Sequence, residues 1–193
     1  MPATIDRLMP HPDVAKRHEI TIRAPAALVM EVARNFDIQS IRVIRVFFWM
    51  RARILGSRAP TTNRPTSLVS GMLQIGWKCL ADEPGSLFIA GAACQPWRPD
   101  VTFAPIAPEQ FAGYAEPDRV KILWTLQADA LGPENTRFST ETRVVATDDQ
   151  ARMKFRRYWG VFGVGIVMIR LFLLTAVRRD AERRWRGERL TDR

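Results

Sequence analysis

The segment that most constrains the fold is the last quarter of the chain. Residues 151–186 have the pattern of one long helix, and residues 158–177 within it carry a single charge, Arg170. Apolar side chains recur there at alternating steps of four and three residues, which is the spacing of one continuous helical face. They are Phe155, Trp159, Phe162, Ile166, Ile169, Leu173 and Ala176. Such a helix either packs lengthwise on a large apolar surface or crosses a membrane.

The sequence favours the packed helix. The apolar stretch reaches the length of about 20 residues that a membrane span needs. However, Arg170 would lie in the hydrocarbon, at a cost of about 2.5–3.5 kcal/mol near the bilayer centre. Gly160, Gly163 and Gly165 dilute the hydrophobicity, and arginine-rich flanks on both sides give the span no orientation. An interfacial helix is the third alternative. The glycines either let the helix bend or approach the sheet closely, or leave room for a ligand.

The positive charge is concentrated at the C-terminal end of the chain. Of the net charge of +9, residues 151–193 contribute +8, because they hold 12 Lys/Arg and 4 Asp/Glu. Arginine-rich helix ends suit anionic lipid headgroups or simple solvation. A nucleic-acid-binding protein would show a basic face with interleaved aromatic residues on a known module, and the sequence contains none. We therefore expect no nucleic-acid partner, and an anionic membrane surface stays an open alternative.

The remainder of the chain has mainly strand patterns. Alternating apolar residues predict a strand at 18–23, a hairpin at 77–94 that turns at Pro84-Gly85, and two antiparallel strands at 120–128 and 137–146. Two short helices are predicted after the first strand. Their ranges are 26–37 and 40–55, and the second has Ile41, Ile44, Phe48 and Met50 on its inner side.

The chain has the length of one domain. We assign residues 17–186 to it, with an irregular, proline-interrupted arm at 1–16, a loop at 56–66 and a basic tail at 187–193. Nothing near the N-terminus has the apolar core of a secretory signal. The two cysteines lie on the two arms of the hairpin, with Cys79 opposite Ala90 and Cys94 out of register for a disulfide. Two reduced thiols indicate a cytoplasmic protein, with contact to the inner face of the membrane as an open alternative.

The order of the predicted elements resembles the START-like helix-grip superfamily (SRPBCC), which includes Bet v 1 allergens, START lipid-transfer domains and polyketide cyclase/dehydrase-like proteins. The resemblance rests on HEITIRAPA at 18–26, FSTETRVVATD at 138–148 and the helix at 155–184. It covers residues 17–185 and is similar to uncharacterised bacterial members of the polyketide cyclase/dehydrase-like branch. It implies an α+β fold, with a curved antiparallel sheet wrapped around the C-terminal helix. It also implies a cavity between them for a lipid, a polyketide-like molecule or an aromatic molecule.

The candidate cavity residues are aromatic or lie on the long helix, together with two ionisable side chains. They are Trp77, Trp97, Trp124, Glu141, Trp159, Phe162, Ile166 and Arg170. Tryptophans of this kind more often belong to an ordinary core, and the simpler interpretation of Glu141 is a solvated ion pair with Arg143. A lone arginine in an apolar helix must find a partner, reach the surface or bind the anionic head of a ligand.

No catalytic constellation is evident. His11 and His18 are the only histidines, no nucleophile and base are suitably spaced, and no cluster has the spacing of metal ligands. We therefore predict no metal and no cofactor, and assign no catalytic residue. The leading hypothesis is the binding or transfer of a hydrophobic small molecule without catalysis. The alternatives are a cyclase/dehydrase-type enzyme that uses Glu141 and Arg170 in the cavity, and a membrane-associated protein that uses the basic-flanked helix. The sequence does not indicate an oligomeric state.

Overall fold

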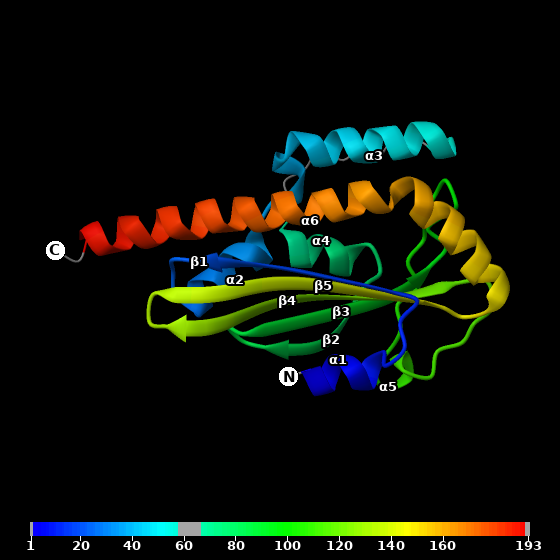
Figure 1. Ribbon diagram of the computed structural model, residues 1–193, viewed down its shortest axis with the longest axis horizontal. Helices are drawn as coiled ribbons and strands as arrows, with labels where there is room; N and C mark the ends of the chain where they lie inside the picture. The colour runs from blue at the N-terminus through cyan, green and yellow to red at the C-terminus, as the bar shows by residue number, and fades with distance from the viewer. Residues whose placement is uncertain (1, 58–66, 192–193) are drawn as a thin grey trace.

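The structure, a computed structural model, describes residues 2–57 and 67–191. Its centre is a five-stranded antiparallel sheet in the order β1-β5-β4-β3-β2, with the long helix α6 (Asp149–Thr191) laid across one face (Figure 1). The strands are β1 (Val14–Ile22), β2 (Lys78–Glu83), β3 (Leu87–Cys94), β4 (Val120–Gly132) and β5 (Asn135–Ala146). This is the helix-grip α+β architecture, so the predicted fold class is confirmed.

Both faces of the sheet are covered. The face toward α6 also carries α2 (Ala26–Asn35) and α4 (Leu68–Gln74), and these elements share one large core with the sheet. The opposite face is covered by α1 (Pro2–Leu8) and α5 (Pro108–Phe111), which bury Ile5 and Phe111 against β3 and β4. Successive side chains of a strand point to opposite faces, so two separate apolar clusters form on one sheet.

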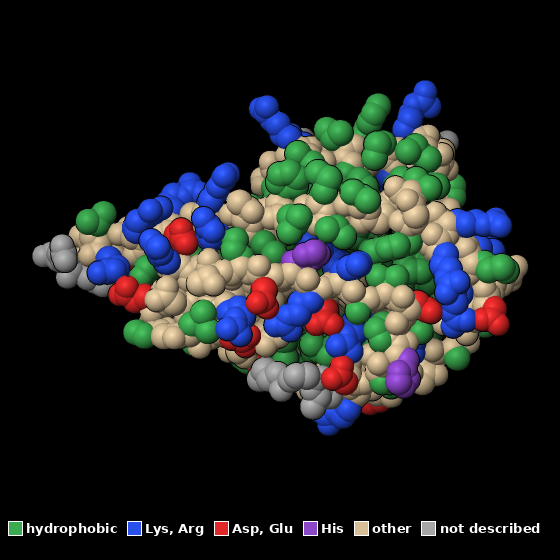
Figure 2. Space-filling view, in the orientation of Figure 1, with side chains coloured by type: hydrophobic (Ala, Val, Ile, Leu, Met, Phe, Trp, Pro, Cys, Tyr) green, Lys and Arg blue, Asp and Glu red, His purple; other side chains and the backbone are tan. Residues whose placement is uncertain are grey.

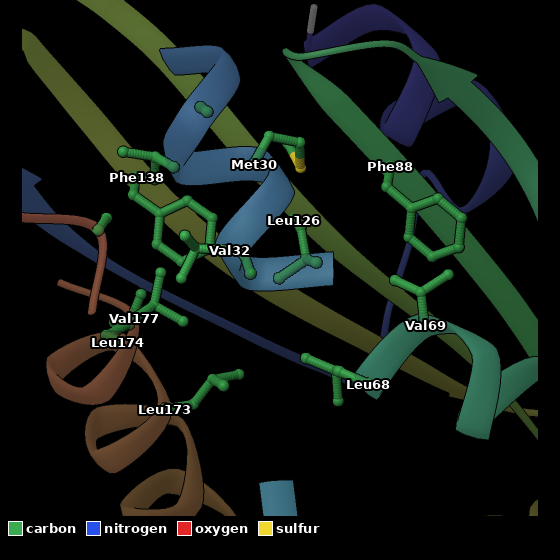
Figure 3. Packing of buried hydrophobic residues seen from close by; sticks show 14 of the residues in the cluster. Met30, Val32, Leu68, Val69, Phe88, Leu126, Phe138, Leu173, Leu174 and Val177 are labelled. Atoms are coloured by element: carbon green, nitrogen blue, oxygen red, sulfur yellow. The ribbon is translucent and has the colours of Figure 1, made fainter. Parts of the chain in front are cut away.

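The main core is centred on β4, β5, α2 and α6. Phe138 of β5 is completely buried and belongs to a cluster with Val32, Leu126, Leu174 and Val177 (Figure 3). These side chains come from four elements, namely β5, α2, β4 and α6. The cluster therefore holds α6 and α2 onto the sheet.

Helix α6 begins at a capped end. The carboxylate of Asp148 accepts a hydrogen bond from the backbone N–H of Ala151 at 2.7 Å, which satisfies one of the free donors of the first turn. The helix continues to Thr191, so residues 187–191, which were predicted to belong to a basic tail, form its last turn. Figure 1 shows that α6 bends in its first third.

In the described residues, α6 is the one helix that is long and apolar enough to cross a membrane. A core helix passes the same test of length and composition, and here α6 packs on β1, β5 and α2 with Phe155, Leu173 and Val177 buried. Only a third of its most apolar 18-residue stretch is buried, however. A long apolar face of α6 is therefore left uncovered.

The position of α3 (Arg42–Leu55) differs from the prediction. Ile44 is buried as predicted, together with Phe47 and Ala52, whereas Phe48 and Met50, which were also expected on the inner side, are 47% and 41% exposed. The helix does not lie on the sheet but packs on the outer side of α6 (Figure 1).

The close contact between α3 and α6 is made by Phe47 and Gly165. A Cβ atom on Gly165 would lie 2.1 Å from the ring of Phe47, so only glycine leaves space for this ring. Gly165 therefore faces another helix and not the sheet, and the room that it leaves is filled by a side chain of α3.

We expect Gly165→Ala to lose the stabilisation that alanine normally brings to a helix. Replacing an unobstructed helical glycine with alanine gains about 1 kcal/mol, whereas overpacking costs about 1–3 kcal/mol. Urea unfolding should therefore show Gly165→Ala to be no more stable than the wild type.

Gly160→Ala is the matched control for this prediction, because a Cβ there has no neighbour within 4 Å in the described part of the chain. It should stabilise the protein by about 1 kcal/mol. Phe47→Ala removes the obstructing ring, so Gly165→Ala should stabilise the Phe47→Ala variant more than it stabilises the wild type. Equal stabilisation by the alanines at 160 and 165 would show that α3 does not rest on Gly165.

The N-terminal arm is more ordered than predicted. Its residues Pro2–Leu8 form α1, and β1 begins at Val14 instead of His18. The arm is fixed by ion pairs to the domain, from Asp6 to Arg143 at 2.6 Å and from Asp13 to Arg152 at 2.9 Å. Most of the loop predicted at 56–66 lies outside the described residues. The predicted hairpin register is confirmed, since Cys79 pairs with Ala90 and both cysteines are free.

Candidate functional site

A cavity of about 380 Å³ lies between the inner face of the sheet, α6, α4 and α3. Its walls are mainly aromatic and aliphatic, and four polar side chains reach it, namely Arg51, Thr142, Tyr158 and Arg170. The inner face of the sheet contributes Trp124 and Val144, and α3 closes the cavity on the outer side with Phe47 and Phe48. Ligand sites in proteins commonly have this size and this mainly apolar character.

The structure brings five of the eight candidate residues to this cavity. They are Trp77, Trp124, Trp159, Ile166 and Arg170. Trp97 lies outside the lining, in a smaller cluster where Lys154 Nζ approaches its ring to 5.8 Å. Phe162 is also outside it and packs against the rings of Phe47 and Tyr158.

Glu141 lies on the other face of the sheet. Its carboxylate accepts a hydrogen bond from Arg143 Nε at 2.6 Å and lies 3.8 Å from Arg17. This pair is largely buried, because Arg143 also contacts Asp6 and the backbone carbonyl of Met9. The favoured Glu141–Arg143 ion pair is present but is largely buried instead of solvated. The alternative, in which Glu141 meets Arg170 in the cavity, is wrong, since alternation along β5 directs Thr142 inward and Glu141 outward.

Arg170 is the charged group on the inner wall of the cavity. It is 7% exposed and donates one hydrogen bond, from a terminal guanidinium nitrogen to the backbone carbonyl of Lys16 at 3.1 Å. In residues 2–57 and 67–191 it has no carboxylate partner. Burial lowers the pKa of Arg170 to about 10, so the guanidinium is still charged at neutral pH. A guanidinium has five N–H donors, so this side chain keeps unused donors beside an apolar space.

A second polar group lies at the α3 side of the cavity. Arg51 donates hydrogen bonds to the backbone carbonyls of Pro96 at 2.9 Å and Arg98 at 3.2 Å, and its Nε donates to the Tyr158 hydroxyl at 3.4 Å. Burial raises the pKa of Tyr158 and raises that of Cys94 to about 12, so both groups stay protonated at neutral pH. Arg51 therefore ties α3 to α6 and to the segment after β3.

Sequence reasoning missed Arg51 and Tyr158 as cavity residues. Arg51 follows Phe47 by four residues, so the two share a face of α3. That spacing was the available signal, but Phe47 was not among the residues expected on the inner side of α3.

His18 is a half-buried residue next to this site. Its Nε2 is enclosed and has no hydrogen-bond partner in the described part of the chain. Burial lowers the pKa of His18, and the positive charges of Arg170 and Lys16 lower it further. His18 is therefore kept neutral where an unfolded chain would already be protonated.

We expect the stability of the protein to fall as the pH drops below about 6.5, the ordinary pKa of histidine. Between pH 6.5 and the lowered pKa of His18, the unfolded chain binds a proton that the folded protein does not bind. Each step down in pH therefore favours unfolding, and the effect ends once the pH is below the lowered pKa. His18→Gln should make this decline shallower in urea unfolding between pH 7 and pH 5. The exposed His11 provides the control, His11→Gln, which should keep the wild-type decline. A His18→Gln profile parallel to the wild type would contradict this account.

The fold and its apolar cavity define a helix-grip protein. No protein-family model matches the chain, and no curated protein matches its sequence. Among solved structures, the chain is similar to DR_A0006 from Deinococcus radiodurans, with 14% identity, a TM-score of 0.33 and coverage of 75% of this chain and 94% of the other.

Two other solved structures are similar to the chain. The Zhui aromatase/cyclase from Streptomyces sp. R1128 is 16% identical, with a TM-score of 0.31 and coverage of 89% and 94%. Ara h 8.0201 is 13% identical, with a TM-score of 0.19 and coverage of 84% and 98%. Similarity of this size does not extend to ligand or activity.

Proposed function

We propose that this protein binds a hydrophobic small molecule with an anionic head group, in the cavity between the sheet, α3 and α6. The observation that supports the proposal is Arg170, a buried guanidinium that has no carboxylate partner among the described residues and lies on the wall of an apolar cavity of about 380 Å³. The apolar body of the ligand would lie among Trp77, Trp124 and Trp159, and its head would lie at Arg170.

The electrostatics of Arg170 favour an anionic head. Burying a charge is costly unless it is paired and hydrogen-bonded, and one backbone carbonyl satisfies only part of a guanidinium. A carboxylate can accept two parallel hydrogen bonds from arginine, which combines charge neutralisation with a fixed orientation. The hydroxyl of Thr142 lines the same cavity and offers a further polar contact.

The structure supports binding or transfer over a cyclase/dehydrase-type reaction. Such a reaction needs a general base in the cavity, and Glu141 lies on the opposite face of the sheet. The described lining residues include no carboxylate and no imidazole. The raised pKa values of Tyr158 and Cys94 make them weak candidates for a base at neutral pH.

Native mass spectrometry of the freshly purified protein is the first test. An extra mass that is lost on denaturation would show a bound ligand and give its class. The apo protein should then bind dodecanoic acid more tightly than 1-dodecanol, as followed by the fluorescence of the cavity tryptophans. If no ligand is retained and neither compound binds, the proposal is wrong.

A further inference from the structure

The outward face of α3 is unusually apolar for a surface helix. Val46, Trp49 and Ile54 are 62%, 63% and 57% exposed, and Val43 and Met50 are each 41% exposed. Figure 2 shows hydrophobic side chains gathered over α3 and the adjoining part of α6. Contiguous apolar surface of this kind marks an interaction site in soluble proteins.

The exposed face of α6 continues this surface. Val161, Val164, Met168 and Leu171 recur at helical spacing and are 43–74% exposed. Because α3 packs on α6 through Phe47, this stripe lies beside α3. The two faces together are called the α3–α6 platform below.

The charged side chains that α3 and residues 150–179 of α6 carry are all positive. Exposed Arg42, Arg45 and Arg53 lie on α3, and Arg157 and Arg178 extend the α6 stripe at its two ends. Neither α3 nor residues 150–179 of α6 contain an aspartate or a glutamate. The platform therefore combines large apolar side chains with arginines only, which is the composition of helices that lie in the headgroup region of a membrane.

We propose that the α3–α6 platform docks on the surface of an anionic lipid bilayer. Trp49 and its apolar neighbours would enter the headgroup region, and the arginines would contact anionic headgroups. A second copy of the chain fits less well, because a symmetric contact between two such platforms would oppose arginine to arginine. The inference goes beyond small-molecule binding and does not depend on it.

This docking is peripheral and uses side chains that do not support the fold. The opposite side of α6 is committed to the core through Leu173, Leu174 and Val177, so α6 cannot enter the bilayer without unfolding the domain. Val46 and Trp49 are more than 60% exposed, so their substitution leaves the core intact.

Vesicle flotation of the full chain tests the proposal. The vesicles are phosphatidylcholine alone, or phosphatidylcholine with phosphatidylglycerol in a roughly three-to-one mixture. The wild type should float with the anionic vesicles only, and less at high salt. The double variant Val46→Ser/Trp49→Ser should bind about ten-fold more weakly or worse. Leu131→Ser/Leu190→Ser, which removes two exposed leucines elsewhere, should bind like the wild type.

The contribution of the arginines to lipid binding is tested by a matched pair of triple variants. Arg42→Gln/Arg45→Gln/Arg53→Gln should reduce binding about ten-fold or more. Substituting three exposed basic residues outside the platform, Arg23, Lys78 and Arg137, by glutamine removes the same net charge and should have a much smaller effect. Equal loss in both triple variants would overturn the assignment of the surface, as would wild-type binding by Val46→Ser/Trp49→Ser.

Size-exclusion chromatography with light scattering tests the alternative occupant of the platform, a second copy of the chain. A wild type that is dimeric, ignores anionic vesicles and becomes monomeric in Val46→Ser/Trp49→Ser would show that a second copy covers the platform. That result would overturn docking on lipid. Lipid docking is measured by flotation, and cavity binding is measured by titration with dodecanoic acid. A negative flotation result therefore does not bear on cavity binding, and the two proposals can fail independently.

Discussion

Phe138→Ala is expected to reduce the free energy of unfolding by about 3–5 kcal/mol, the usual cost of truncating a buried phenylalanine. Phe138 is completely buried, in the cluster where β5 meets α2 and α6. The substitution removes the apolar contacts of the ring and leaves a void that the surrounding elements fill only in part. Urea unfolding followed by circular dichroism measures the loss. The dependence of the unfolding free energy on urea concentration should not change if unfolding exposes the same surface area in both proteins.

Phe172→Ala is the matched control for this prediction. Phe172 lies on α6 and is 37% exposed, so its truncation should cost about 1 kcal/mol or less. A similar loss in both variants would mean that α6 is not held on the sheet through the cluster around Phe138.

Arg170→Met is expected to weaken the binding of dodecanoic acid at least about ten-fold, and to leave the binding of 1-dodecanol nearly unchanged. Truncating one partner of a buried charged pair usually costs 2 kcal/mol or more, and every 1.4 kcal/mol corresponds to a factor of ten. The variant should fold at least as well as the wild type, because replacing an unpaired buried charge by an apolar side chain of similar length is often neutral or stabilising. Fluorescence titration and urea unfolding provide the two readouts.

The same substitution at Arg157 is the control. Arg157 lies on α6 but is exposed, so Arg157→Met should bind both compounds like the wild type. Arg170→Lys should restore part of the affinity, since it keeps a positive charge but loses the planar set of donors. An acid affinity that is equal in Arg170→Met and the wild type would exclude Arg170 as the site of the head group.

The sequence was sufficient to predict the elements in which apolar residues recur at a clear helical or strand spacing. The long helix, the hairpin and the strands of β4 and β5 follow directly from steps of four and three or from strict alternation, and the pairing of Cys79 with Ala90 follows from the position of the turn. The placement of Arg170 beside a cavity also fits its isolation in an apolar helix.

Two features were not predictable for physical reasons. In α3, apolar residues occur on all sides between Val43 and Met50, so periodicity does not select one inner face. In β5, alternation separates Thr142 from Glu141 but does not say which side meets α6. Because α1 covers the outer face, Glu141 is buried there as well, and burial does not distinguish the two sides.

One helix thus serves two environments. Phe47 and Phe48 of α3 border the cavity, and Val46 and Trp49, one position away, face outward across a rod about 10–12 Å wide. Thermodynamic linkage follows from this geometry. Any partner that binds the outer side of α3 with different affinity for the filled and the empty protein must change the affinity for the cavity ligand by the same factor. The coupling free energy is therefore a measurable property of α3, obtained by titrating the ligand with and without the outer partner.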